Sequence, residues 1–179
     1  MFFKKGKDSI SKRIDKANAM FDIFKRDKAF EEFSNLQKEF PDNLDVQFGL
    51  AILYNSSRQQ DLAIDILKRI LTIDNKHEST KCVLPTIIYE YAIQLSESGK
   101  KELARKYLVD FIELENDNKV DLANGYKELA VVEKSLGNKV DAKKFIEKAI
   151  EINASNKNEA DSKTNSKYYR EILDSFNSS

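Results

Sequence analysis

The chain has 179 residues, of which 41% are hydrophobic, and this apolar content suffices for a folded core and excludes a disordered chain. Basic and acidic residues balance at 30 each, and the isoelectric point of about 6.6 argues against a nucleic-acid-binding protein. Glycine and proline are scarce, whereas Lys, Glu, Leu, Ile and Ala are common, which predicts an all-α protein.

The N-terminal part of the chain is basic. Residues 1–28 carry nine basic and four acidic residues, whereas residues 41–118 carry nine and thirteen. We expect residues 1–9 to form a flexible basic tail, and membrane-surface attachment through this tail is a disfavoured alternative. No signal peptide and no apolar run of the ~20 residues that a membrane span needs is visible, so we expect a cytoplasmic location.

The first predicted helical hairpin covers residues 10–43. Its first helix is expected to turn apolar side chains inward, namely Ile14, Ala17, Phe21 and Phe24. Its second helix opens at Lys28-Ala29 and ends at Phe40-Pro41, because proline does not continue a helix.

Three further hairpins follow, at residues 44–77, 85–118 and 123–156. In the clearest, 123–156, two amphipathic helices meet at Gly137-Asn138, which tolerate a left-handed backbone. An alanine stands near the start of the second helix of all four hairpins, at positions 29, 63, 104 and 142. A small residue there lets the paired helices approach closely. The inserted segments 78–84 and 119–122 are expected to lengthen the helices that follow them.

The C-terminal region, residues 157–179, begins with a polar stretch that predicts a linker. An amphipathic helix is then expected over about 166–176, with Tyr168, Tyr169, Ile172, Leu173 and Phe176 on one side. We interpret it as a cap for the last hairpin. A helix that docks onto another chain, or that folds back into this protein's own groove, is the alternative.

No group of residues indicates catalysis. His77 is the only histidine and Cys82 the only cysteine, which leaves a zinc site short of ligands and excludes an internal disulfide. The polar sequence around His77 predicts an exposed loop. No phosphate-binding loop or dinucleotide fingerprint is present. We therefore expect no enzyme activity, no metal and no cofactor.

A repeat of ~34 residues built from helix pairs resembles the tetratricopeptide repeat. The best copies, 44–77 and 123–156, show the family's order of large, small and aromatic residues: Leu50, Ala51, Tyr54, Ala63, Leu67 and Ile70 in one, and Tyr126, Leu129, Ala130, Gly137, Ala142, Ile146 and Ala149 in the other. Phe111 departs from the pattern because a small residue is usual there, so local packing must differ. Lys16 stands at an apolar position, which indicates a first helix shifted by one residue.

The resemblance covers about four fifths of the chain. It implies a right-handed superhelical α-solenoid of about four tandem helix-turn-helix repeats with a C-terminal capping helix, and a concave groove formed by the first helix of each repeat. Ligand positions of the family, carried over to this sequence, give a candidate protein-binding groove: Phe48, Ile52, Asn55, Tyr89, Ile93, Lys127, Val131 and Lys134. Further positions carried over are Asp45, Ser56, Thr86, Ser96, Glu97, Asn124 and Ser135 and, in the uncertain first repeat, Ile14, Asn18 and Phe21.

Within this set, Phe48, Ile52, Tyr89, Ile93 and Val131 would form an apolar strip along the groove, which is typical of an interaction surface. The lysines and asparagines with which some family members clamp chaperone tails are absent. The sequence therefore predicts a cytoplasmic scaffold that binds a peptide or helical segment of another protein in the groove. A small chaperone for a secreted substrate, or a structural protein that assembles into homo-oligomers, is the alternative.

Overall fold

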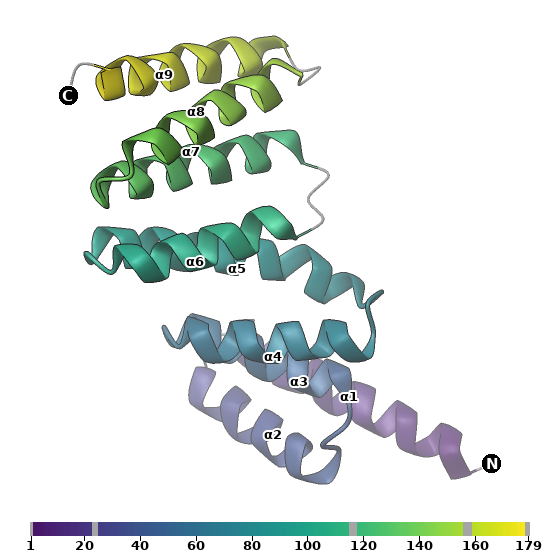
Figure 1. Ribbon diagram of the computed structural model, residues 1–179. Helices are drawn as coiled ribbons and strands as arrows, with labels where there is room; N and C mark the ends of the chain where they lie inside the picture. Colours follow the sequence, from purple (N-terminus) through teal and green to yellow (C-terminus); the bar gives the residue numbers. More distant parts are fainter. Residues whose placement is uncertain (1, 23–24, 115–117, 156–158, 178–179) are drawn as a thin grey trace. The chain divides into compact units, whose positions relative to one another are not determined.

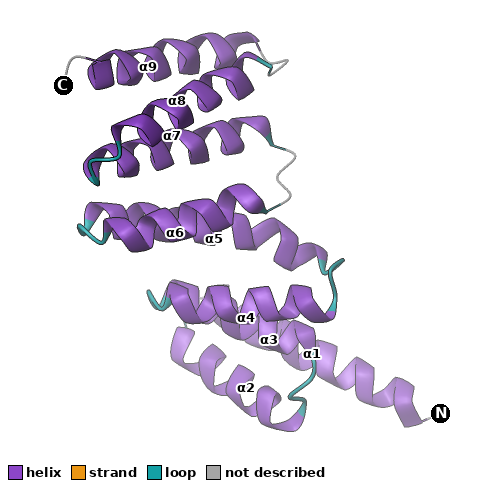
Figure 2. Ribbon diagram, viewed as in Figure 1, coloured by secondary structure: helices purple, strands orange, loops and turns teal. Residues whose placement is uncertain are grey.

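The computed structural model describes residues 2–22, 25–114, 118–155 and 159–177, and these residues form helices and turns without a strand (Figures 1 and 2). The chain divides into two compact units, Met1–Ile87 and Ile88–Ser179, which are described separately below as unit 1 and unit 2. The prediction of an all-α protein made of helical hairpins is confirmed.

Unit 1 contains α1 (Phe2–Asp22), α2 (Arg26–Glu39), α3 (Leu44–Ser56), α4 (Gln60–Ile73) and the first part of α5 (Glu78–Glu97). Helix α1 packs against α2, α2 against α3 and α3 against α4, and α1 also contacts α3. The apolar faces of α1, α2 and α3 meet in one core cluster, composed of Ala17, Ala29, Phe33, Leu36, Val46, Leu50 and Leu53. Burial of these faces stabilises the hairpins, because no single amphipathic helix can hide its own apolar stripe.

The first helix has the shifted register that its sequence indicated. Ala17 is fully buried, and Ile14 and Phe21 pack against the core cluster of unit 1, whereas Phe24 lies outside the described residues. The helix begins at Phe2, so residues 2–9, expected to be a flexible tail, continue α1. A physical reason is that this stretch holds no proline, and its single glycine does not suffice to end a helix.

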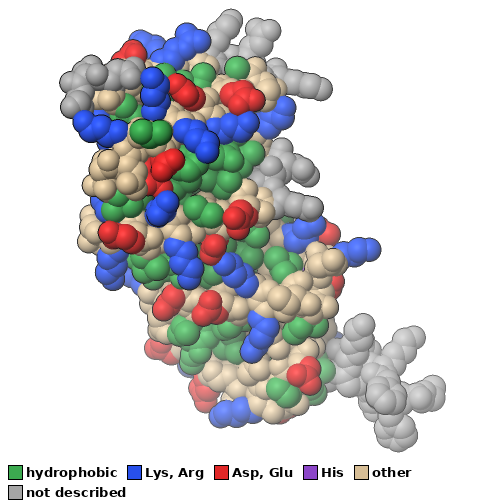
Figure 3. Space-filling model, viewed as in Figure 1, with side chains coloured by type: hydrophobic (Ala, Val, Ile, Leu, Met, Phe, Trp, Pro, Cys, Tyr) green, Lys and Arg blue, Asp and Glu red, His purple; other side chains and the backbone are tan. Residues whose placement is uncertain are grey.

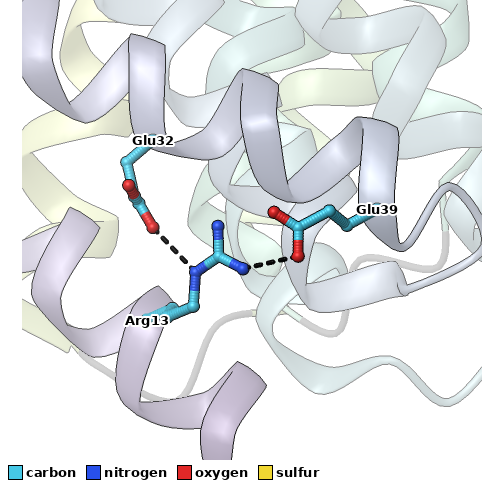
Figure 4. A network of polar contacts seen from close by, with 3 residues as sticks. All are labelled: Arg13, Glu32 and Glu39. Atoms are coloured by element: carbon cyan, nitrogen blue, oxygen red, sulfur yellow. Dashed lines mark hydrogen bonds and ion pairs between the residues drawn. The ribbon is translucent and has the colours of Figure 1, made fainter.

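A network of ion pairs joins α1 to α2 (Figure 4). The Arg13 guanidinium donates from Nε to Glu32 Oε1 at 2.9 Å and from Nη1 to Glu39 Oε2 at 2.7 Å. Glu32 and Glu39 are two helical turns apart on α2, so one arginine reaches both carboxylates. These bonds hold the pKa of Glu39 below its ordinary value.

Unit 2 contains the remainder of α5 together with α6 (Lys101–Glu113), α7 (Lys119–Ser135), α8 (Lys139–Ala154) and α9 (Glu159–Asn177). The four helices from α6 onward pack each against the next. Helix α5 meets α6 through the rings of Tyr91 and Tyr107, whose centroids are 5.0 Å apart. The backbone turns left-handed at Gly99 and Gly137, with φ of 82° and 87°, where glycine avoids the strain of a side chain.

Both inserted segments lengthen the helix that follows, as expected. Helix α5 begins at Glu78 and α7 begins at Lys119. Pro85 therefore lies inside α5 and not in its first turn, where its missing N–H removes one helical hydrogen bond.

The four alanines that marked the hairpins in the sequence, Ala29, Ala63, Ala104 and Ala142, are completely buried. This burial confirms that the alanines mark points of close helix approach, where a larger side chain would separate the paired helices.

The C-terminal helix is longer than expected. It begins at Glu159, within the stretch 157–165 that was predicted to be a linker. Tyr169 is fully buried in a second core cluster, and Ile172, Leu173 and Phe176 pack against the same cluster. The predicted apolar stripe of the capping helix therefore faces the rest of unit 2, except for Tyr168, which is 51% exposed.

None of the described helices combines the length and the apolar character that crossing a membrane requires. On the face shown in Figure 3, the described basic and acidic side chains are interspersed. A nucleic-acid-binding surface would instead gather lysines and arginines into one basic patch.

Candidate binding surfaces

Three helices of unit 1 surround a cavity of about 380 Å³, which we name the α1/α3 pocket. Helix α1 forms one wall and α3 the other, and the first turn of α5 adds Ser79. The N-cap of α3 is built by Asn43, whose Oδ1 accepts a hydrogen bond from Val46 N at 3.0 Å. The lining residues are Ile10, Ser11, Ile14, Asp15, Asn18, Asn43, Asp45, Phe48, Gly49 and Ser79.

Four of these lining residues stand at ligand positions carried over from the resemblance, namely Ile14, Asn18, Asp45 and Phe48. They come from the first two repeats and lie far apart in sequence, yet they line one cavity. Ile52 and Asn55 lie further along α3, half-buried, and are not among the lining residues. Phe21, the remaining residue from the first repeat, packs into the core cluster of unit 1.

His77 contacts two of the residues that line the pocket, Phe48 and Asp45. Its ring lies 5.7 Å from the Phe48 ring between centroids, and its Nε2 is 3.5 Å from Asp45 Oδ1. Its Nδ1 accepts a hydrogen bond from Thr80 N at 3.3 Å, so the imidazole caps the start of α5. His77 lies in the loop between α4 and α5 as predicted, but the expectation that it is exposed is wrong, since only 12% of the side chain is exposed. Sequence pattern could not reveal this, because Phe48 and Asp45 belong to another helix.

The charged side chains that line the α1/α3 pocket are acidic. Asp15 on α1 and Asp45 on α3 are exposed, and the lining residues whose side chains the structure describes include no lysine or arginine. The apolar side chains of Ile10, Ile14 and Phe48 lie beside these carboxylates. The pocket thus combines negative charge with an apolar surface.

Unit 2 holds the predicted groove residues of the third and fourth repeats. The Tyr89 ring packs against Phe111, with centroids 5.2 Å apart, and burial followed by the nearby charge of Glu128 raises the pKa of Tyr89. Ile93 is half-buried, and Val131 is 37% exposed. Phe48 and Ile52 belong to unit 1, so the proposed apolar strip is divided between the two units and stays a prediction.

Helix α9 contacts three of the ligand positions of the fourth repeat, namely Asn124, Lys127 and Lys134. Tyr169 donates a hydrogen bond from its hydroxyl to Asn124 Oδ1 at 2.8 Å. Lys127 Nζ lies 5.7 Å from the centroid of the Tyr168 ring. Lys134 Nζ donates to the Ser175 carbonyl at 3.1 Å and lies 4.6 Å from the centroid of the Phe176 ring. These contacts leave the lysines of the fourth repeat less free to meet a ligand than the sequence suggested.

Among the residues that the structure describes, no group of three or more His, Cys, Asp and Glu side chains is arranged to hold a metal ion. Cys82 is a free, exposed thiol.

Comparison with known proteins supports the repeat assignment. Residues 124–156 match the family described as "Tetratricopeptide repeat", which agrees with the predicted fourth repeat. No curated protein sequence matches the chain. Among solved structures, a MamA protein is 20% identical over 93% of this chain and 85% of its own, with a TM-score of 0.53. BtubC (BKLC) from P. vanneervenii is 17% identical over 90% of this chain and 71% of its own, with a TM-score of 0.52. At such identities the likeness concerns the fold alone.

Proposed function

We propose that this chain, a tetratricopeptide-repeat protein, is a non-catalytic scaffold that binds a segment of another protein on the face formed by the first helices of its repeats. One observation carries the proposal. Ligand positions of two separate repeats, represented by Ile14 on α1 and Phe48 on α3, line a single cavity that is open to solvent. A cytoplasmic location stays a prediction.

The size and composition of the α1/α3 pocket suit a polypeptide segment. A cavity of about 380 Å³ can hold one or two large side chains while the rest of a segment lies outside. Asn18, Ser11 and Ser79 add neutral polar groups to the lining, and such groups can exchange hydrogen bonds with a partner's backbone. Helix-lined grooves recognise segments in this way, with apolar anchors in pockets and polar contacts around them.

Affinity purification followed by mass spectrometry tests the proposal with a matched pair of variants. Phe48→Ser removes the aromatic wall of the pocket, whereas Ile73→Ser removes an apolar side chain that is 63% exposed in the same unit and does not line the cavity. We expect the wild type and Ile73→Ser to capture the same partner and Phe48→Ser to lose it, with unchanged circular dichroism for both variants. Equal capture by a folded Phe48→Ser variant would contradict the proposal.

Assembly into homo-oligomers and service as a chaperone for a secreted substrate stay alternatives. Light scattering over a range of concentrations tests assembly into homo-oligomers, because the average mass of a self-assembling protein would rise with its concentration.

A further inference from the structure

We infer that the α1/α3 pocket binds a lysine or arginine of the partner segment, together with a large apolar side chain next to it. This inference rests on the proposed function and names the chemistry of the partner. It is carried by two carboxylates and an apolar wall that line the same cavity.

The carboxylates come from opposite walls. Asp15 lies on α1 and Asp45 on α3, and both side chains belong to exposed residues. Among the described residues, Asp15 has no ion-pair or hydrogen-bond partner, and Asp45 meets only His77 Nε2, at 3.5 Å. The Asp45 side chain is 73% exposed, so it remains accessible to a cation from another chain.

Among the described residues that line the pocket, none is basic and able to neutralise these carboxylates. Lys12 and Lys16 are exposed on α1, but neither lines the cavity. A cationic group of a partner would therefore find two acceptors, whereas an acidic segment would be repelled by both. A metal ion is a poorer occupant, because two carboxylates fall short of the six to eight oxygen ligands that calcium takes.

The apolar wall explains why a bare cation would not suffice. Ile10, Ile14 and Phe48 present hydrocarbon next to the carboxylates. Lysine and arginine place their methylene stems along apolar surfaces and keep the charged head in a polar setting, which is the arrangement this pocket offers. A neighbouring leucine, isoleucine or phenylalanine of the partner would use the rest of the apolar wall.

Selection from a random library of 12-residue peptides displayed on phage, against the full chain, tests this chemistry. We expect the enriched peptides to share a lysine or arginine adjacent to a large apolar residue. Synthetic versions would then be titrated by fluorescence polarisation against wild type and Asp15→Asn/Asp45→Asn. The double variant should bind about tenfold more weakly, equivalent to ~1.4 kcal/mol, and this difference should shrink at high salt.

The control is Asp61→Asn/Asp65→Asn, which removes the same charge from two exposed residues of α4 that do not line the pocket. This variant should bind as the wild type does. A peptide whose basic residue is replaced with glutamate should no longer bind the wild type, but it should bind the Asp45→Lys variant.

Two outcomes would overturn this inference but leave the proposed function intact. One is enrichment of peptides that need Phe48 but lack a basic residue, and the other is equal peptide affinity for the wild type and the Asp15→Asn/Asp45→Asn variant. Self-association that the same variant abolishes would show that a second copy fills the pocket, and it would also overturn the inference. A selection that yields no peptide dependent on Phe48 would count against the proposed function as well.

Discussion

The ring of Phe111 on α6 fills the space beside Gly125 on α7 where a side chain would otherwise stand. A Cβ added to Gly125 would lie 2.7 Å from Phe111 Cε1, which is closer than atoms pack. Phe111 was the departure from the repeat pattern in the third copy, and the glycine on the next helix compensates for it. Gly49 on α3 gives room to Phe33 on α2 in the same way.

Gly125→Ala should therefore destabilise the protein by about 1–2 kcal/mol, because the buried ring of Phe111 must shift to avoid the new methyl group. In a Phe111→Ala background the same substitution should stabilise by up to ~1 kcal/mol, since alanine favours helix over glycine. Urea denaturation of the two single variants and the double variant measures this coupling. Equal effects of Gly125→Ala in both backgrounds would show that the ring and the glycine are independent.

We expect the buried hydroxyl of Tyr169 to make the folded protein less stable at high pH. Burial, followed by the charge of Glu128, raises the pKa of Tyr169 to about 12 from its ordinary value of 10.0. Because the folded state favours the neutral phenol, its contribution to stability is complete below pH 10 and disappears as the pH rises toward 12. Between these values, the free energy of unfolding should fall more steeply for wild type than for Tyr169→Phe.

The same variant has a second expected effect near neutral pH. Tyr169→Phe removes the hydrogen bond to Asn124 Oδ1, at a cost of about 1 kcal/mol. Tyrosine absorbance at 295 nm, followed during alkaline titration, should lose one late-titrating group in this variant. An unchanged titration curve would show that the hydroxyl is accessible and that α9 is not docked.

We expect the ion pairs of Arg13, which join α1 to α2, to weaken in acid. The arginine lowers the pKa of Glu39 from 4.5, so the stabilisation is present above that pH and is lost as the pH falls through the lowered value. Arg13→Gln should melt at a lower temperature than wild type at pH 7, and the difference should vanish in acid. Lys16→Gln, which changes the same charge on exposed α1, is the control and should melt as wild type does at both values.

Arg105 on α6 and Glu133 on α7 form an ion pair that links two repeats, with Nε 2.6 Å from Oε1 and with only 1% of the Glu133 side chain exposed. Arg105→Ala would leave this carboxylate with its hydrogen bond from Asn138 alone, and it should destabilise by about 1–3 kcal/mol. Adding Glu133→Gln should recover most of the loss, because a neutral amide is less costly to bury than an unpaired charge. Thermal melts of the three proteins measure the effect, and a double variant no better than Arg105→Ala would argue against it.

The local pattern of the sequence determined the helices of this protein and their pairing. Apolar residues at helical spacing placed the two helices of each hairpin, and the recurrent alanines at 29, 63, 104 and 142 marked where the helices touch. These features depend on residues within one or two turns of each other, so they can be read without coordinates. The helix boundaries at Phe2 and Glu159 were missed because the stretches 2–9 and 159–165 lack apolar residues at regular helical spacing.

Only the tertiary structure decided which side chains meet between helices. Asp15 of α1 lines one pocket with Asp45 and Phe48 of α3, and α9 contacts Lys127 and Lys134 of α7, although no local sequence pattern links these pairs of helices. Phe111 departs from the repeat pattern, and only the structure shows that Gly125 on the next helix makes room for its ring. Such contacts depend on how neighbouring helices are rotated and offset, and packing of whole side-chain surfaces sets that arrangement.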